Sequence, residues 1–164
     1  MAPPLYGMRT VADLFTRRQL VALTTFSDLV GEARECVVRD VLQVDPQATD
    51  AHAYADAVAT YLAFAVDRGT DYWSSFALWA GDFIAHTFGR PALGIVWDYA
   101  EANPFSNSTG NWEGAINWVA RVVQELPCGV PGIAIQHDAT TLHTDVGLVS
   151  TDPPYYNNVP YAVM

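Results

Sequence analysis

Residues 16–42 read TRRQLVALTTFSDLVGEARECVVRDVL, and this stretch decides the fold of the N-terminal part of the chain. Thr16 is followed three positions later by Gln19, which is the pattern of a capping box at the start of a helix. Apolar residues then recur at every third or fourth position, with charged residues between them. We predict an amphipathic helix over residues 17–42 that ends before Pro46, because the residue before a proline disfavours helical backbone.

Three more helices are predicted further along the chain. One spans residues 51–68, with Asp50 as its N-cap and Gly69 as its stop signal. A short one spans residues 79–88 in an aromatic segment, and another spans residues 112–126, where the apolar spacing again fits a helix. The aromatic side chains at helical spacing indicate a packed core rather than a binding platform.

The sequence changes character after Pro127. Residues 132–136 and 146–150 are short apolar runs and are predicted to be strands of a parallel sheet. Two strands are too few to stand alone, so they would pack on the helices or join strands from elsewhere. The predicted fold class is α/β, with a mainly helical region at residues 1–126 and part of a sheet at residues 127–164.

Composition excludes several classes of protein. The 164 residues are 51% hydrophobic and 16% charged, which suits a folded globule. The formal net charge of −10 repels phosphate, so the chain alone is not a DNA-binding module. Cys36 and Cys128 lie too far apart to suggest a metal site or a disulfide framework, and no signal peptide or apolar membrane-spanning stretch is seen. The four histidines lack metal-ligand spacing, so we expect no metal site. Because no signal peptide or membrane-spanning stretch is seen, we expect a cytoplasmic protein without membrane contact.

The tetrapeptide Asp152-Pro153-Pro154-Tyr155 follows the second predicted strand and precedes Tyr156. An exocyclic amino group on a base is a poor nucleophile, because its lone pair is delocalised into the ring. Asp152 and the carbonyl of Pro153 can accept its hydrogens, since proline keeps its C=O while lacking an N–H. Consecutive prolines hold the backbone rigid, and Tyr155 can stack on a flipped base. This pattern favours amino methylation over the alternative, a rigid turn that carries a surface aspartate.

The chain also resembles a known family. Residues 149–156 are similar to motif IV of the DNA methyltransferases that act on adenine N6 or cytosine N4. Residues 7–20 and 97–105 extend the likeness to the middle of the long adenine-specific DNA methylases, which begin with a domain of unknown function. The resemblance implies a Rossmann-like methyltransferase sheet, S-adenosylmethionine as methyl donor and DNA as substrate of the complete protein.

The same resemblance implies roles for individual residues. Asp152, Pro153, Pro154 and Tyr155 would be catalytic, and Tyr155 and Tyr156 would bind the base. Asp138 would lie near the adenine of the cofactor, because residues 136–139 look like the end of the motif III strand; an ordinary loop-capping aspartate is the alternative.

The sequence departs from the family in two ways. No Gly-rich cofactor loop is recognisable, and Asn157 stands where the family usually has an acidic residue. We therefore expect a fragment of a longer methylase, or one piece of a split methylase. A non-catalytic helical scaffold and a methyltransferase for RNA or a protein amide remain alternatives.

Overall fold

The computed structural model describes residues 6–89, 93–94, 96–127, 129, 132–138, 140–141 and 148–152. The chain divides into two units, Met1–Leu126 and Pro127–Met164. The first unit contains a short 3₁₀ helix, three α-helices and a small hairpin, and the two units are described separately below.

The first long helix, α1, spans Arg17–Val44 and confirms the helix predicted from the capping box. The backbone N–H of Thr16 donates to Oε1 of Gln19 over 2.7 Å, and the hydroxyl of Thr16 accepts the backbone N–H of Gln19 over 3.3 Å. A 3₁₀ turn, η2 (Val11–Leu14), precedes the helix. The helix start was predictable because its determinants lie within four consecutive residues.

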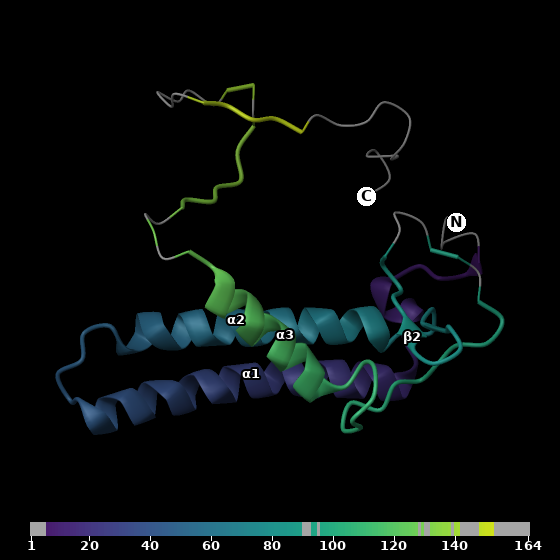
Figure 1. The fold of residues 1–164 in the computed structure, drawn as a ribbon, viewed down its shortest axis with the longest axis horizontal. Helices are drawn as coiled ribbons and strands as arrows, with labels where there is room; N and C mark the ends of the chain where they lie inside the picture. The colour runs from purple at the N-terminus through teal and green to yellow at the C-terminus, as the bar shows by residue number, and fades with distance from the viewer. Residues whose placement is uncertain are drawn as a thin grey trace. The chain divides into compact units, whose positions relative to one another are not determined.

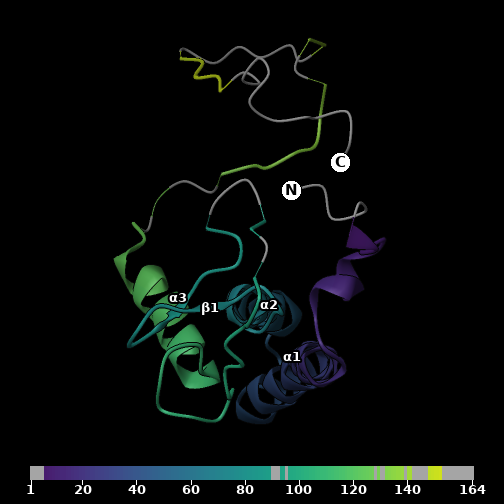
Figure 2. The same cartoon turned by 90° about the vertical axis from the view of Figure 1, so that its right-hand side faces the viewer.

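Helix α2 spans Ala51–Tyr72 and lies beside α1, with the connecting loop at one end of the pair (Figures 1 and 2). Its start after Asp50 agrees with the prediction, but it continues past the predicted stop at Gly69. Gly69 is a packing residue instead: a Cβ placed on it would lie 3.0 Å from ring atoms of Trp73. The helix therefore needs a glycine here so that the indole ring can lie against its backbone.

Alanine at position 69 is expected to destabilise the protein by about 1–3 kcal/mol, the usual cost of overpacking a core. The indole of Trp73 is 1% exposed, so moving it away from the added methyl group would disturb the core around it. This cost outweighs the helix propensity of alanine over glycine, which is about 1 kcal/mol. Urea unfolding followed by circular dichroism measures the difference.

Gly31→Ala is the matched control, because Gly31 lies inside α1 and a methyl group added to it would meet no neighbouring side chain within 4 Å. It is expected to stabilise the protein by about 0.4–1 kcal/mol, since alanine reduces the entropy of the unfolded chain. Equal stabilisation by the two substitutions would contradict the packing role of Gly69.

The predicted helix over residues 79–88 is wrong. This segment forms an antiparallel hairpin of β1 (Leu78–Trp79) and β2 (Ile84–Ala85), with Leu78 opposite Ala85. The turn contains Gly81 at φ +101°, a backbone conformation that glycine adopts readily, and the N–H of Ala80 donates to the carbonyl of Phe83. The aromatic spacing fitted a helix, but the left-handed glycine reverses the chain direction.

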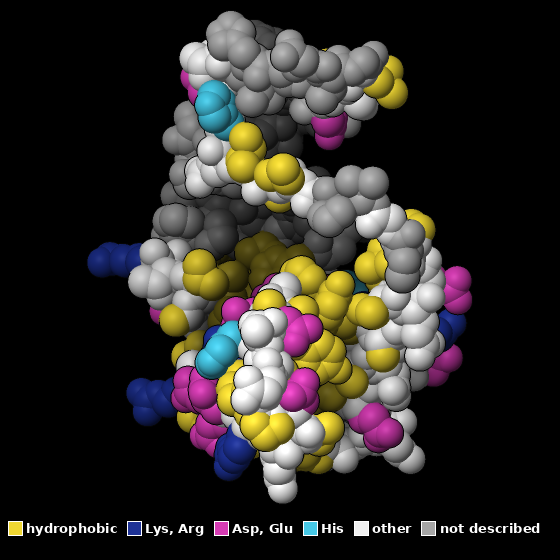
Figure 3. Space-filling view, turned by 90° about the vertical axis from the view of Figure 1, so that its left-hand side faces the viewer, with side chains coloured by type: hydrophobic (Ala, Val, Ile, Leu, Met, Phe, Trp, Pro, Cys, Tyr) yellow, Lys and Arg dark blue, Asp and Glu magenta, His cyan; other side chains and the backbone are white. Residues whose placement is uncertain are grey.

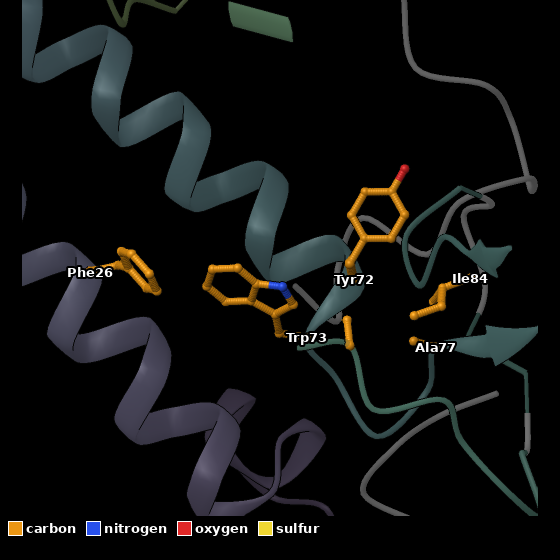
Figure 4. Packing of buried hydrophobic residues seen from close by; sticks show 6 residues of the cluster. Phe26, Tyr72, Trp73, Ala77 and Ile84 are labelled. Atoms are coloured by element: carbon orange, nitrogen blue, oxygen red, sulfur yellow. The ribbon is translucent and has the colours of Figure 1, made fainter. Parts of the chain in front are cut away.

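Helix α3 spans Trp112–Glu125, as predicted to within one residue, and packs on α2 (Figure 1). The side chain of Asn111 caps it by accepting the N–H of Gly114. The ring of Trp112 stacks on Phe26 from α1, with ring centroids 4.4 Å apart. Trp73 approaches Phe26 from the end of α2, and the buried cluster continues through Ala77 to Ile84 of the hairpin (Figure 4).

The described residues of the second unit contain no strand. Residues 132–138 and 148–152 have no regular secondary structure. They are exposed, and this includes their apolar side chains. The strand prediction is therefore wrong for the described part of 132–136 and 146–150, while residues 146–147 lie outside it. A strand needs a hydrogen-bonded neighbour, and two short strands are too few to form a stable sheet. The chain is mixed α/β and mostly helical, and its described residues form no Rossmann-like sheet.

Candidate functional site

Asp152 is the one residue of the predicted catalytic tetrapeptide that the structure describes. It lies on the surface, and its carboxylate makes no hydrogen bond with the described residues. Pro153, Pro154, Tyr155 and Tyr156 lie outside the described residues. Toward the described residues, both acceptor oxygens of this carboxylate are therefore unused.

Asp138 forms a local turn with Thr140 and Thr141. Its Oδ1 accepts the backbone N–H of Thr140 over 2.9 Å and the Thr140 hydroxyl over 2.8 Å. Its backbone carbonyl accepts the N–H of Thr141 over 3.0 Å. The hydrogen bonds from Thr140 lower the pKa of the exposed Asp138 carboxyl below its ordinary value, because they stabilise the charged form. One oxygen thus shapes the turn, and the described residues do not engage Oδ2 in a hydrogen bond.

The part of the chain that the structure describes shows no contact between Asp138 and Asp152. Both belong to the second unit, but the strand ends that were expected to bring them together are not formed by the described residues. The loop-capping alternative for Asp138 agrees with its bonds to Thr140.

A cluster that the sequence did not suggest joins α2 to the hairpin. Nδ1 of His86 lies 2.6 Å from a carboxylate oxygen of Asp71, and Nε2 lies 3.3 Å from the hydroxyl of Tyr72. The other Asp71 oxygen accepts the backbone N–H of Phe88 over 2.8 Å. Both imidazole nitrogens are therefore engaged within the protein, which suits a structural connection better than proton exchange with a ligand.

Two of the pockets in the first unit are lined by both polar and apolar side chains. One, of about 320 Å³, borders the N-terminus of α3, where Arg68 lies over the ring of Trp118 with 4.8 Å between its guanidinium carbon and the ring centroid. The other, of about 340 Å³, lies beside the first turn of α1 and is lined partly by Gln19 and Trp73. Sequence patterns could not predict either, because each combines segments far apart in the chain.

The described residues contain no metal centre, and comparisons with known proteins give no related protein. The described residues contain no group of three or more histidine, cysteine, aspartate or glutamate side chains placed to hold a metal ion. Within the same part of the chain, no helix is both long enough and apolar enough to cross a membrane. Comparison of the chain with models of protein families, with curated proteins and with solved structures finds no match.

Proposed function

We propose that this chain is the base-handling part of an S-adenosylmethionine-dependent DNA methyltransferase. The enzyme would methylate an exocyclic amino group, and adenine N6 is the favoured target. The observation that carries the proposal is the sequence Asp152-Pro153-Pro154-Tyr155. The similarity of residues 7–20 and 97–105 to long adenine-specific methylases supports it. The protein would act in the cytoplasm, and the rest of a split or longer methylase would be its partner.

The chain's own residues would hold and aim the amino group. The carboxylate of Asp152 and the carbonyl of Pro153 would accept its two hydrogens, which localises the nitrogen lone pair for attack on a methyl group. Tyr155 and Tyr156 would stack on the flipped base, and stacking is worth about 1–3 kcal/mol per base. S-adenosylmethionine would supply the electrophilic methyl group.

The described residues fit only part of a cofactor site. Oδ2 of Asp138, which the described residues leave without a hydrogen bond, can accept one from a nucleoside, but the sequence has no recognisable Gly-rich turn to hold the nucleoside. The net charge of −10 likewise leaves the phosphate contacts of DNA to another part of the protein. Both gaps agree with a methylase completed by a partner or by further sequence.

A non-catalytic helical scaffold is the second candidate, and an apolar surface favours it. Side chains of α2 and α3 leave exposed apolar area next to a groove of about 340 Å³ between the two helices, and Figure 3 shows apolar side chains gathered on one face of the molecule. The exposed members are Tyr61, Phe64, Trp118, Val122 and Leu126. Exposed apolar area of this kind commonly marks a protein interface, and the rest of the methylase would cover it.

Calorimetric titration of the chain with S-adenosylmethionine separates the two candidates. The proposed function predicts binding that Asp138→Ala weakens at least about tenfold, which corresponds to the loss of one hydrogen bond to a charged group. Asp28→Ala, at an exposed position of α1, should leave the affinity unchanged. Absence of binding by the chain would favour the scaffold. Assays of methyl transfer to DNA, RNA and protein would then distinguish a DNA methylase from one acting on RNA or a protein amide.

A further inference from the structure

Helix α3 carries a row of exposed apolar side chains. Trp118 and Val122 are followed by Leu126, the C-cap, at intervals of four residues, so the three side chains lie along one side of the helix. They are 53%, 51% and 50% exposed, so about half of each side chain is in contact with water. Burial of this row against another apolar surface is favourable, because it removes that area from water.

Helix α2 extends this surface. Tyr61 and Phe64 are exposed and line a shallow pocket of about 360 Å³ together with the row on α3. We call the five side chains the apolar face: Tyr61, Phe64, Trp118, Val122 and Leu126. Among the described residues, no aspartate or glutamate lines this pocket, although the chain has 18 acidic residues. The centre of the apolar face can therefore be buried without the cost of desolvating a carboxylate.

Opposite charges lie one helical turn apart on one edge of the row. Arg121 and Glu125 are exposed, and neither forms an ion pair with the described residues. The guanidinium carbon of Arg121 lies 5.7 Å from the ring centroid of Trp118, which places it beside the apolar row. Glu125 follows four residues later and therefore lies on the same edge. This edge is complementary to a second copy of itself that runs in the opposite direction.

A second copy of α3 fits the apolar face in an antiparallel arrangement. Rows of residues spaced four apart pack between the same rows of another helix, which is the commonest form of helix packing. With Val122 at the two-fold axis, Trp118 lies opposite the partner's Leu126, because both are four residues from the centre. Like edges of the two helices meet, so Arg121 lies about 3 Å along the helix axis from the partner's Glu125 and can pair with it. Two-fold symmetry forms each of these contacts twice.

We propose that the apolar face binds a second copy of this chain and forms a two-fold symmetric dimer through α3. The formal net charge of −10 repels the second copy, but charges further apart than about 8 Å are largely screened at physiological ionic strength, so the ion pairs at the contact prevail. The rest of a methylase is the competing occupant of this face, and it predicts a monomeric chain. All contacts lie in the first unit, so a failure of the proposed methyltransferase function leaves the dimer intact.

Sedimentation equilibrium of the full chain, at about 1–300 µM, tests the proposal. We expect a reversible equilibrium of monomer and dimer with a Kd below about 100 µM, the affinity of a small interface. Trp118→Ala should raise this Kd at least about tenfold, because a central tryptophan contributes strongly to such a contact. Trp97→Ala is the control, since Trp97 is fully exposed outside α2 and α3, and it should leave the Kd unchanged. A chain that stays monomeric over this range would overturn the proposal.

Charge reversal tests the antiparallel arrangement and keeps the apolar contacts. Arg121→Glu places a carboxylate beside the partner's Glu125 and should raise the Kd at least about fivefold. The double variant Arg121→Glu, Glu125→Arg restores the ion pairs and should return the Kd to within about twofold of the wild type. Arg39→Glu makes the same charge change at an exposed site on α1 and should leave the Kd unchanged. Equal dimer stability in the wild type, Trp118→Ala and Arg121→Glu would exclude this face.

Discussion

Replacement of Trp73 by alanine is expected to lower the free energy of unfolding by about 3–5 kcal/mol, the range for truncating a buried aromatic side chain. The indole is 1% exposed, and its ring centroid lies 5.3 Å from that of Phe26. Its Nε1 donates to the carbonyl of Gly110 over 2.6 Å. One side chain thus connects α1, the end of α2 and the loop before α3, so its loss weakens three contacts at once.

Urea unfolding followed by far-ultraviolet circular dichroism measures this effect, and Trp97→Ala is the matched control. Trp97 is 100% exposed, so the same substitution there should change the free energy of unfolding by less than about 0.5 kcal/mol. Trp73→Phe should fall between the two, because it keeps most of the ring contacts and loses the hydrogen bond to Gly110. Similar losses for Trp73→Ala and Trp97→Ala would show that the core lies elsewhere.

The helices could be predicted from sequence where their determinants are local. The capping box at Thr16 and Gln19 acts within three residues, and the apolar spacing of residues 112–126 is also a local pattern, so the starts of α1 and α3 could be predicted. The end of α2 could not be predicted in this way. Gly69 reads as a stop signal in isolation, and only the position of Trp73 shows that a small residue was needed for packing.

The hairpin shows a second limit of sequence patterns. Trp79, Phe83 and Phe88 recur at a spacing that a helix and a tight hairpin can both produce. The conformation of Gly81, with φ at +101°, decides between them, and it depends on the pairing of Leu78 with Ala85. Periodicity therefore gave the wrong secondary structure for this segment, and the expectation of a core position is also wrong for these three aromatic residues, which are exposed.

The candidate sites show the same difference between local and long-range determinants. The tetrapeptide at Asp152 is contiguous, so the hypothesis of amino methylation could be drawn from the sequence without a fold. The pocket at Gln19 could not, because its Arg18–Glu101 ion pair joins residues 83 positions apart. Asp71 and His86 are likewise brought together by the hairpin. Chemistry that depends on contiguous residues is visible in a sequence, whereas sites assembled by packing need the structure.

If the chain belongs to the proposed methylase, replacement of Asp152 by alanine in the complete protein is expected to reduce methyl transfer by about 10²–10³-fold, the range for removing one group that stabilises a transition state. Alanine cannot accept a hydrogen of the amino group, so the nitrogen lone pair stays delocalised in the ring. Asp152→Asn keeps one carbonyl oxygen as acceptor and should retain more activity. Transfer of a tritiated methyl group from S-adenosylmethionine to adenine-containing DNA measures the three proteins.

A catalytic role for Asp152 can be separated from a structural one, because its carboxylate is exposed and makes no hydrogen bond with the described residues. Asp152→Ala should therefore leave the free energy of unfolding within about 0.5 kcal/mol of the wild type while abolishing transfer. Asp40→Ala, at an exposed position of α1, should alter neither quantity. Unchanged transfer by Asp152→Ala would remove the tetrapeptide from the reaction. A parallel loss of stability and transfer would instead indicate that the aspartate holds a turn.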